Sequence, residues 1–231
     1  MKRFYKQVSV SDQDGLFSVL LDGKPIKTPE KSPCQMPNKS MAEAVAKEWD
    51  EQEVEITPAN MPITKLVNTA IDRVDKRRAA LTDELVEYAG SDQLCYRAEE
   101  PIELIEQQNK VWDPLLKRMN DLHDIELKLA GGIIFVEQEK SQLSKIRTLI
   151  DVMESFPLTA FYGMTTVTGS VTIGLNLFEG HITVDEAWEA GQLDENFQIS
   201  KWGSDFEAEE RRKNLKAELI NAAYFLDLSK A

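Results

Sequence analysis

The chain has 231 residues, of which 42% are hydrophobic and 29% are charged, a composition that fits a globular protein and excludes intrinsic disorder. It holds 40 acidic residues against 27 lysines and arginines, a formal net charge of −13. Such a surface repels phosphate backbones and anionic lipids, so nucleic acid and membranes are disfavoured as partners. The charge favours a basic protein surface as partner, or serves solubility alone.

The first predicted elements are β-strands, over residues 3–36. Residues 4–10 have a strand-like composition, residues 12–15 have the chemistry of a turn, and residues 16–21 form a second apolar run. An Asp-Gly pair at residues 22–23 is a strong signal for a tight hairpin turn, and the prolines that follow suit a strand at a sheet edge. A small sheet that includes a hairpin is therefore expected.

Helices are expected in the rest of the chain. Ser40 and Glu43 have the spacing of a capping box, which predicts a helix that starts there and lies on the small sheet. Pro62 suits the first turn of the next helix, and apolar residues follow it at spacings of three and four. The predicted fold class is α+β, with a small β-rich N-terminal domain that includes a helix (residues 1–60) and a larger all-α C-terminal domain (residues 61–231).

Within the C-terminal domain, residues 77–90 and 101–120 predict helices, and residues 131–136 predict a break in extended form. The next helix is expected to end at Pro157, because proline interrupts a helix. An apolar stripe marks this helix and consists of Leu143, Ile146, Ile150 and Met153.

Two further capping boxes precede helices near the end of the chain. Thr183 with Glu186 is the first, and Ser204 with Glu207 is the second. The last helix is expected to bury one apolar face, formed by Leu215, Leu219, Ala222 and Leu226.

Residues 155–178 contain no charged side chain and are long enough to span a membrane. Threonine, serine and glycine interrupt the apolar residues of this segment, so no continuous apolar surface faces outward. A buried central helix is therefore expected, in which Gly163, Gly169 and Gly174 allow neighbours to approach closely.

No signature of an enzyme or metal site occurs in the sequence. The motifs GxxxxGK[ST], GxGxxG, HExxH and GxSxG are all absent. Cys34 and Cys95 form no CxxC pair and have no histidine nearby, so two buried thiols are expected rather than a disulfide framework or a zinc site. No catalytic residue, metal ligand or cofactor is therefore predicted.

His123 leaves one enzymatic alternative open. It lies in the sequence among Asp121, Asp124 and Glu126, so it could act as a general base that a carboxylate orients. A surface histidine near a helix end is the simpler interpretation, and His181, which follows a glycine in a turn, is interpreted in the same way.

Acidic residues and aromatic residues are concentrated between residues 179 and 210. Ten acidic residues occur there with Lys201 as the one lysine or arginine. Aromatic side chains are interleaved with them: Trp188, Phe197, Trp202 and Phe206. Aromatic side chains that charges surround are typical of a protein-binding surface, although aromatic residues at helical spacing also pack in cores.

Several motifs follow one another in an order that resembles a known family. They are Arg3-Phe4-Tyr5-Lys6, residues 21–29 (LDGKPIKTP), residues 48–52 (EWDEQ), Met61-Pro62-Ile63-Thr64, residues 68–72 (NTAID), residues 92–98 (DQLCYRA), residues 112–115 (WDPL) and residues 193–203 (LDENFQISKWG). Together they resemble the assembly chaperones that act on the α subunit of the F-type ATP synthase catalytic head.

The resemblance implies a two-domain chaperone that binds the unassembled α subunit, prevents its aggregation and releases it when the β subunit arrives. It implies no catalysis and no cofactor. In the family an acidic residue just after the leucine of the last motif is important, and here that residue is Asp194, where relatives often carry glutamate. The partner-binding residues are accordingly expected to be Asp194, Glu195, Gln198 and Trp202.

The remaining expectations concern state and location. The chain is expected to be a monomer, without membrane insertion. Residues 1–5 are followed by no apolar region and no Arg/Ser-rich leader, so the cytoplasm is expected, or the mitochondrial matrix if a leader was removed. Two alternatives stay open: an acidic binding module for another basic partner, and an enzyme that uses His123 with a carboxylate.

Overall fold

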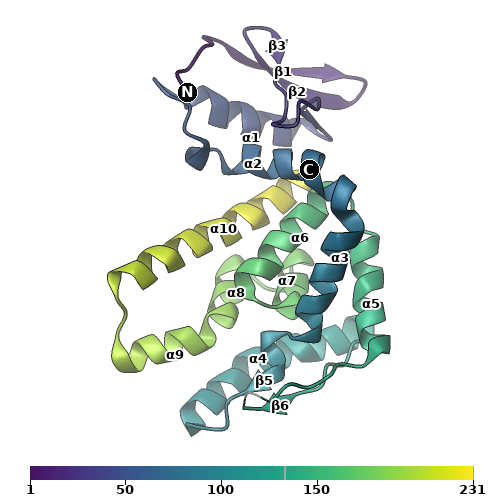
Figure 1. The fold of residues 1–231 in the computed structure, drawn as a ribbon, viewed down its shortest axis with the longest axis vertical. Coiled ribbons are helices and arrows are strands. Elements are labelled where there is room, and N and C mark those ends of the chain that lie inside the picture. Colours follow the sequence, from purple (N-terminus) through teal and green to yellow (C-terminus); the bar gives the residue numbers. More distant parts are fainter. Residues whose placement is uncertain (133, 231) are drawn as a thin grey trace. The chain divides into compact units, whose positions relative to one another are not determined.

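The computed structural model describes residues 1–132 and 134–230. Contacts between Cα atoms divide the chain into two compact units. Unit 1 consists of residues 1–78, 154–160 and 224–231, and unit 2 consists of residues 79–153 and 161–223. The β-strands of unit 1 and the helices of unit 2 confirm the predicted α+β class, whereas the predicted domain boundary at residue 60 stays a prediction (Figure 1).

Unit 1 contains an antiparallel sheet of four short strands: β1 (Val8–Gln13), β2 (Leu16–Leu21), β3 (Lys24–Pro25) and β4 (Gln35–Met36). Strand β2 pairs with the other three. Two-residue turns end β1 and β2, and both turns have positive φ at an Asp and at the Gly after it, Gly15 and Gly23. Because this is the backbone of the favoured hairpin turns, the predicted hairpin is confirmed.

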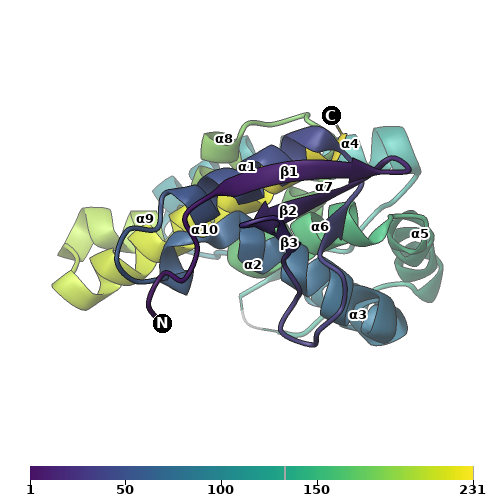
Figure 2. The same ribbon diagram turned by 90° about the horizontal axis from the view of Figure 1, so that it is seen from above.

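Helix α1 (Lys39–Asp50) packs on the sheet and buries Met41 and Val45 (Figure 2). The predicted cap at Ser40 is wrong, because Asn38 caps this helix. The side-chain oxygen of Asn38 accepts a hydrogen bond from the Met41 N–H at 2.9 Å. Asparagine is among the strongest N-cap residues, and an extended backbone at Asn38 lets the helix start before Ser40.

The short 3₁₀ helix η1 (Pro58–Asn60) precedes α2 (Pro62–Thr69), which starts with Pro62 in its first turn as predicted. A buried carboxylate from α1 caps α2. Glu48 accepts hydrogen bonds from the N–H groups of Ile63 and Thr64, both at 2.7 Å, and from the Thr64 hydroxyl. These bonds satisfy donors that a helix start leaves unpaired.

Replacing Glu48 by glutamine is expected to lower the free energy of unfolding by about 1–2 kcal/mol, because one acceptor oxygen for the α2 donors is lost. Urea denaturation followed by circular dichroism measures this loss. Glu43→Gln is the matched control on the exposed face of α1 and is expected to change stability little. Equal effects of the two variants would contradict the capping role.

The helices that follow include a π-helical turn, η2 (Ala70–Val74), a short 3₁₀ helix, η3 (Gln93–Cys95), and the α-helices α3 (Asp75–Gly90), α4 (Ile102–His123), α5 (Lys140–Asp151), α6 (Ser155–Thr168), α7 (Val171–Phe178), α8 (Val184–Gly191), α9 (Leu193–Trp202) and α10 (Phe206–Lys230). The predicted helices over residues 77–90 and 101–120 are confirmed. In the predicted break at residues 131–136, Ile133 lies outside the described residues. Next to it β6 (Ala130–Gly131) pairs in parallel with β5 (Tyr96–Arg97).

The charge-free segment forms α6 and α7. Gly169, with φ of +67°, separates them, so the expected single helix is wrong, although most of the segment is buried as predicted. A Cβ on Gly163 would lie 3.3 Å from Ala222, and one on Gly174 would lie 2.7 Å from the Thr165 hydroxyl, so close approach explains both glycines. Among the described residues, no helix is long and apolar enough to cross a membrane.

Pro157 does not end the preceding helix, contrary to the prediction. Helix α5 already ends at Asp151, and Pro157 lies in the first turn of α6. A proline there costs no helical hydrogen bond, because the first N–H groups of a helix have no intrahelical partner. The apolar stripe of α5 is confirmed at Ile146 and Ile150, which are both buried.

A fully buried carboxylate joins two segments of unit 2. Asp92 accepts hydrogen bonds from the Ser170 hydroxyl, at 2.7 and 2.9 Å, from the Thr172 N–H at 2.9 Å and from the Leu94 N–H at 3.0 Å. Ser170 in turn caps α7 by accepting from the Ile173 N–H. Asp92 therefore fixes η3 against the start of α7.

One of the two predicted capping boxes near the end of the chain forms. Thr183 accepts from the Glu186 N–H, and the Glu186 carboxylate accepts from the Thr183 N–H. The box at Ser204 is wrong, because Asp205 accepts from the Ala208 N–H instead. Aspartate caps a helix about as well as serine does, and here it starts α10 one residue later.

Replacing Thr183 by alanine is expected to destabilise the protein by about 1 kcal/mol, the usual effect of losing an N-cap side chain. Thermal unfolding measures the change. Ser204→Ala is the control, since Ser204 caps no helix here, and an equal loss in both variants would contradict the assignment of caps.

The two cysteines are free thiols, as predicted. Cys34 lies in unit 1 and Cys95 in unit 2, and both are buried. Burial raises the pKa of each thiol to about 12, which keeps both protonated and unreactive.

Candidate functional site

Helix α9 presents the residues that the sequence predicts for partner binding. It buries Leu193 and Phe197 in unit 2 and packs against α4. It ends at Gly203, whose φ of +78° suits glycine, and a short turn leads into α10 (Figure 1). Its burial on one side leaves the opposite side of α9 open to a partner.

Three of the four predicted residues share that exposed side. Asp194, Gln198 and Trp202 follow one another at spacings of four, which places them along one face of the helix. All three are exposed, and the Trp202 side chain is 79% exposed. An exposed tryptophan beside a carboxylate and an amide offers both apolar and polar contacts to a partner.

Glu195 does not share that side. Its carboxylate forms ion pairs with Arg211 at 3.1 Å and Arg212 at 3.4 Å, both on α10. Arg212 also lies over the ring of the buried Trp188. Glu195 therefore connects α9 to α10.

A buried glutamine holds Asp194 in place. The Gln108 side chain on α4 is 1% exposed, and its Nε2 donates to Asp194 Oδ1 at 2.8 Å. Its Oε1 accepts from the Ala98 N–H at 2.9 Å, which fixes the amide orientation. Gln108 could not be predicted from the sequence, because 86 residues separate it from Asp194 and no local pattern marks it.

The aromatic residues of this region divide into two groups. Trp188 and Phe197 are buried, as expected for residues at helical spacing. Trp202 and Phe206 are exposed by 79% and 76%, and they flank the turn between α9 and α10. This exposed pair, which we call the α9–α10 tip, presents apolar surface beside the acidic residues Asp205 and Glu207.

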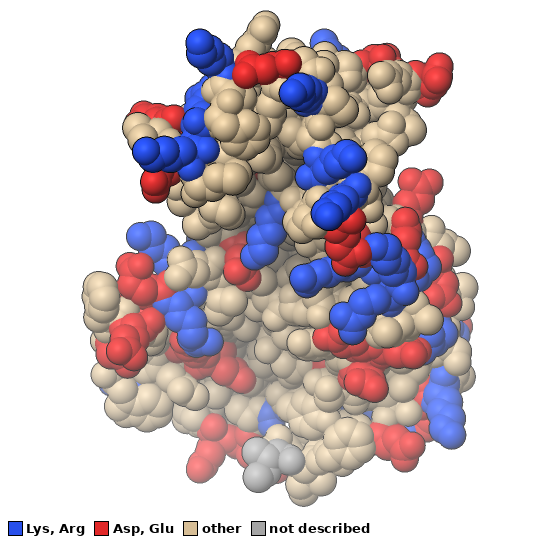
Figure 3. Space-filling model, turned by 45° about the horizontal axis from the view of Figure 1, so that its top comes forward, with Lys and Arg blue, Asp and Glu red and all other residues tan. Residues whose placement is uncertain are grey.

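Charge is distributed unequally between the two units. Unit 1 holds 14 acidic and 14 basic residues, whereas unit 2 holds 26 acidic and 13 basic residues. The whole net charge of −13 is therefore carried by unit 2. Figure 3 shows one face of the protein, on which basic and acidic side chains are interspersed.

Cations of α10 partly neutralise the acidic stretch at residues 179–210. Besides the pairs of Glu195, Lys216 forms an ion pair with Asp185 at 2.8 Å. Within the described residues, Asp194 has Gln108 as its side-chain partner and forms no ion pair with a cation, so its charge remains available.

Both histidines of the chain contact one carboxylate. The Nε2 atoms of His123 and His181 lie 2.9 Å and 3.2 Å from carboxylate oxygens of Glu179. The enzymatic alternative considered the acidic neighbours in sequence, Asp121, Asp124 and Glu126, as partners of His123. The carboxylate that His123 contacts is instead that of Glu179. Glu179 follows the last residue of α7, so this cluster joins the ends of α4 and α7.

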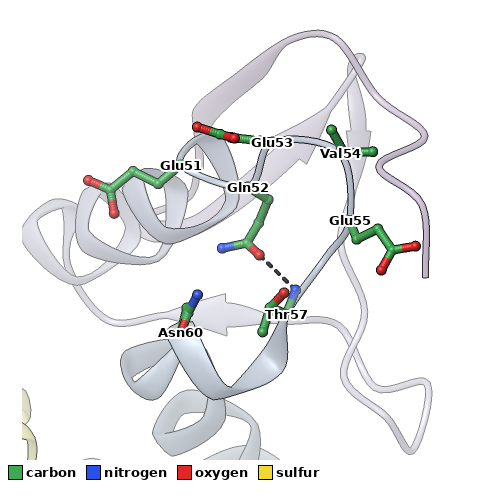
Figure 4. Close-up of a pocket in the computed structure, with 7 residues that line it drawn as sticks. All are labelled: Glu51, Gln52, Glu53, Val54, Glu55, Thr57 and Asn60. Atoms are coloured by element: carbon green, nitrogen blue, oxygen red, sulfur yellow. Dashed lines mark hydrogen bonds between the residues drawn. The ribbon is translucent and has the colours of Figure 1, made fainter.

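A cavity beside the end of α1 has an acidic rim but no converging ligands. The carboxylates of Glu51 and Glu55 point to opposite sides, while Gln52 points inward and its side-chain oxygen accepts from the Thr57 N–H at 2.8 Å (Figure 4). Over the part of the chain that the structure describes, no group of three or more His, Cys, Asp or Glu residues could hold a metal ion.

Comparison with known proteins agrees with this architecture. Residues 2–120 match the family model described as "ATP12 chaperone protein". A curated relative, the mitochondrial protein atp12 of Schizosaccharomyces pombe, is 27% identical over 96% of this chain and 81% of its own.

Two solved structures are also similar to the chain. Atp12 from Paracoccus denitrificans superimposes with a TM-score of 0.94 and 34% identity, covering 99% of this chain and 98% of its own. A protein from Agrobacterium tumefaciens superimposes with a TM-score of 0.92 and 36% identity, covering 98% and 85%. Neither the His123 enzyme nor a binding module for a different partner is favoured by these relatives. The chain therefore belongs to the ATP12 chaperone protein family, the assembly chaperones of the F1 ATP synthase α subunit.

Proposed function

We propose that this protein binds the unassembled α subunit of the F-type ATP synthase, prevents its aggregation and hands it to the β subunit. The observation that carries the proposal is the similarity to Atp12 proteins over nearly the whole chain. The proposed contact residues are Asp194, Gln198 and Trp202 on the exposed side of α9, with Glu195 beside them.

The physical reason for such a chaperone lies in its client. A subunit made before its partner exposes the apolar surface that later forms the interface, and such surfaces aggregate. The α9–α10 tip offers exposed aromatic side chains as anchors, and the acidic charge of unit 2 steers a basic surface toward them. Moderate affinity suits release by competition, so the β subunit displaces the chaperone without catalysis or a cofactor.

The functional test is light scattering of freshly unfolded α subunit diluted into buffer, with and without this protein and without β subunit. Suppression of scattering at a near-stoichiometric ratio is expected, because each chaperone covers one client surface. Bovine serum albumin at the same concentration is the control. Scattering that falls no further than with albumin would overturn the proposal.

The proposal also covers the oligomeric state and the cellular location of the protein. It acts as a monomer that is not an enzyme, in the cytoplasm of a bacterial host or in the mitochondrial matrix. The mitochondrial relative supports the second location for a eukaryotic host. Analytical ultracentrifugation tests the monomer, and a dimer at micromolar concentration would contradict it.

A further inference from the structure

Unit 1 contains a groove that is separate from the proposed contact residues on α9. The groove runs along α2 and η2, has a volume of about 490 Å³ and is called the α2 groove here. The residues that matter for its chemistry are Trp49, Ile56, Met61, Asn68, Lys65 and Arg73. Trp49, Ile56 and Met61 give it an apolar wall, and Ile56 and Met61 are themselves buried.

Among the residues that the structure describes, the exposed side chains of the α2 groove that carry an unpaired charge are cations. The ion pairs in the described part of unit 1 involve other cations: Arg3, Lys39, Lys47, Lys76 and Arg78. Lys65 and Arg73 are exposed, and neither has an ion pair among the described residues. Two unpaired cations beside an apolar wall are notable in a chain with a net charge of −13.

The carboxylates that line the same groove are already occupied. Asp72 is buried and accepts hydrogen bonds from the Thr28 hydroxyl at 2.6 Å and from the Glu30 N–H at 3.1 Å. Glu30 itself forms an ion pair with Lys76. Lys76 offsets the charge of Glu30, and Asp72 keeps its charge but is buried, so within the described chain Lys65 and Arg73 are the exposed, unpaired charges that the groove presents to a ligand.

The spacing of the two cations limits what can bind. Lys65 and Arg73 are eight positions apart on a continuous helical run, so their Cα atoms lie roughly 12 Å apart. An extended peptide covers roughly 13 Å in four residues, and its residues i, i+2 and i+4 point to the same side. A segment of the pattern Glu-x-Leu-x-Glu therefore places two carboxylates at the cations and one apolar side chain between them.

We propose that the α2 groove binds an extended segment of the client in which two carboxylates, four residues apart, flank one apolar side chain. Asn68 lies between the two cations on the same stretch of helix, and its amide has no hydrogen-bond partner among the described residues. It is available to the backbone of such a segment. The assignment of this segment to the client rests on the proposed function. The preference of the groove for carboxylates does not depend on that function.

This second contact has a different electrostatic character from the first. Unit 2 has an excess of acidic residues and attracts a basic surface, while the α2 groove attracts carboxylates. A client that engages both must carry charges of both signs at separate places. Such a requirement discriminates against proteins that are simply basic.

The test uses the full chain and a fluorescein-labelled peptide, Ser-Ser-Glu-Ser-Leu-Ser-Glu-Ser-Ser, with binding followed by fluorescence anisotropy. A second probe has lysine at both glutamate positions. The double variant Lys65→Glu/Arg73→Glu reverses the charge of the groove. The matched control, Lys110→Glu/Lys140→Glu, makes the same charge change at exposed lysines of unit 2 that have no ion pair among the described residues.

We expect the wild-type protein and the control variant to bind the glutamate probe equally. The groove variant is expected to bind it at least about tenfold more weakly, because two favourable charge contacts become repulsive. The lysine probe can be attracted to the acidic unit 2, so the groove variant is expected to bind it no more weakly than the wild-type protein does. Equal binding of the glutamate probe by both variants, weaker binding of the lysine probe by the groove variant, or no binding of the glutamate probe by the wild-type protein would each overturn the inference.

The folding of the groove variant is checked by circular dichroism, and Lys65→Ala/Arg73→Ala serves as a milder second variant that is expected to weaken binding less. The probe assay contains no α subunit, so its failure leaves the proposed function untouched. Conversely, a light-scattering assay without suppression would leave a positive probe result in place.

Discussion

Replacing Asp92 by alanine is expected to lower the free energy of unfolding by about 3–5 kcal/mol, the range seen when one partner of a buried polar network is removed. The Ser170 hydroxyl and the N–H groups of Thr172 and Leu94 all donate to this carboxylate. Alanine leaves these buried donors without an acceptor. Urea denaturation followed by circular dichroism measures the loss.

Asp92→Asn is the informative companion, because asparagine keeps the shape and one acceptor oxygen. We expect it to lose clearly less stability than alanine. Asp151→Ala, at the exposed end of α5, is the control for removing a carboxylate and is expected to be nearly neutral. A loss below about 1 kcal/mol for Asp92→Ala would show that the site relaxes around the missing acceptor.

The pH dependence of stability gives a second measure of Asp92. Burial raises the pKa of this carboxyl above its ordinary value, even though several hydrogen bonds favour the charged form. The folded state therefore keeps the proton to higher pH than the unfolded state does. Between the ordinary carboxyl pKa and the raised pKa, stability falls as the pH rises. The Asn variant is expected to lose this part of the pH dependence.

Reversing the charge of Asp194 is expected to weaken binding of the α subunit by about 10- to 100-fold while leaving the fold intact. Asp194 is exposed on α9, so lysine there meets solvent rather than core, but it presents the wrong charge to a basic partner. The measurement is isothermal titration of the chaperone with α subunit, accompanied by thermal unfolding of the free variant.

Two controls test whether the loss of affinity depends on the position of the charge and on the orientation of Asp194. Glu218→Lys makes the same charge change on the exposed side of α10, and unchanged affinity there would show that position matters. Gln108→Leu removes the hydrogen bond that orients Asp194 and is expected to weaken binding less than the reversal does. An affinity of Asp194→Lys equal to that of the wild type would remove Asp194 from the contact surface.

Elements that depend on local sequence could be predicted well. The hairpin follows from Asp-Gly pairs that tolerate positive φ, and α2 follows from Pro62 and an apolar stripe. Competition between neighbouring caps could not be resolved from spacing alone. Asn38 replaces Ser40 and Asp205 replaces Ser204 because each starts its helix with a better-placed acceptor.

Features that join distant segments could not be predicted. Glu48 caps a helix that starts 14 residues later, and Asp92 meets Ser170 across 78 residues. The difference in net charge between the two units could not be predicted, because residues of α6 and α10 are divided between the units. Trp188 is buried and Trp202 is exposed. Spacing alone could not tell which of the two faces solvent, because this depends on the packing of α8 and α10.

The most direct measurement of the central claim is size-exclusion chromatography with light scattering of α subunit mixed with this protein, before and after β subunit is added. The account predicts a complex of one chaperone with one α subunit. That complex should disappear when β subunit is added, as free chaperone and an assembly of α with β elute instead. No complex with α subunit, or a complex that persists unchanged with excess β subunit, would contradict the account.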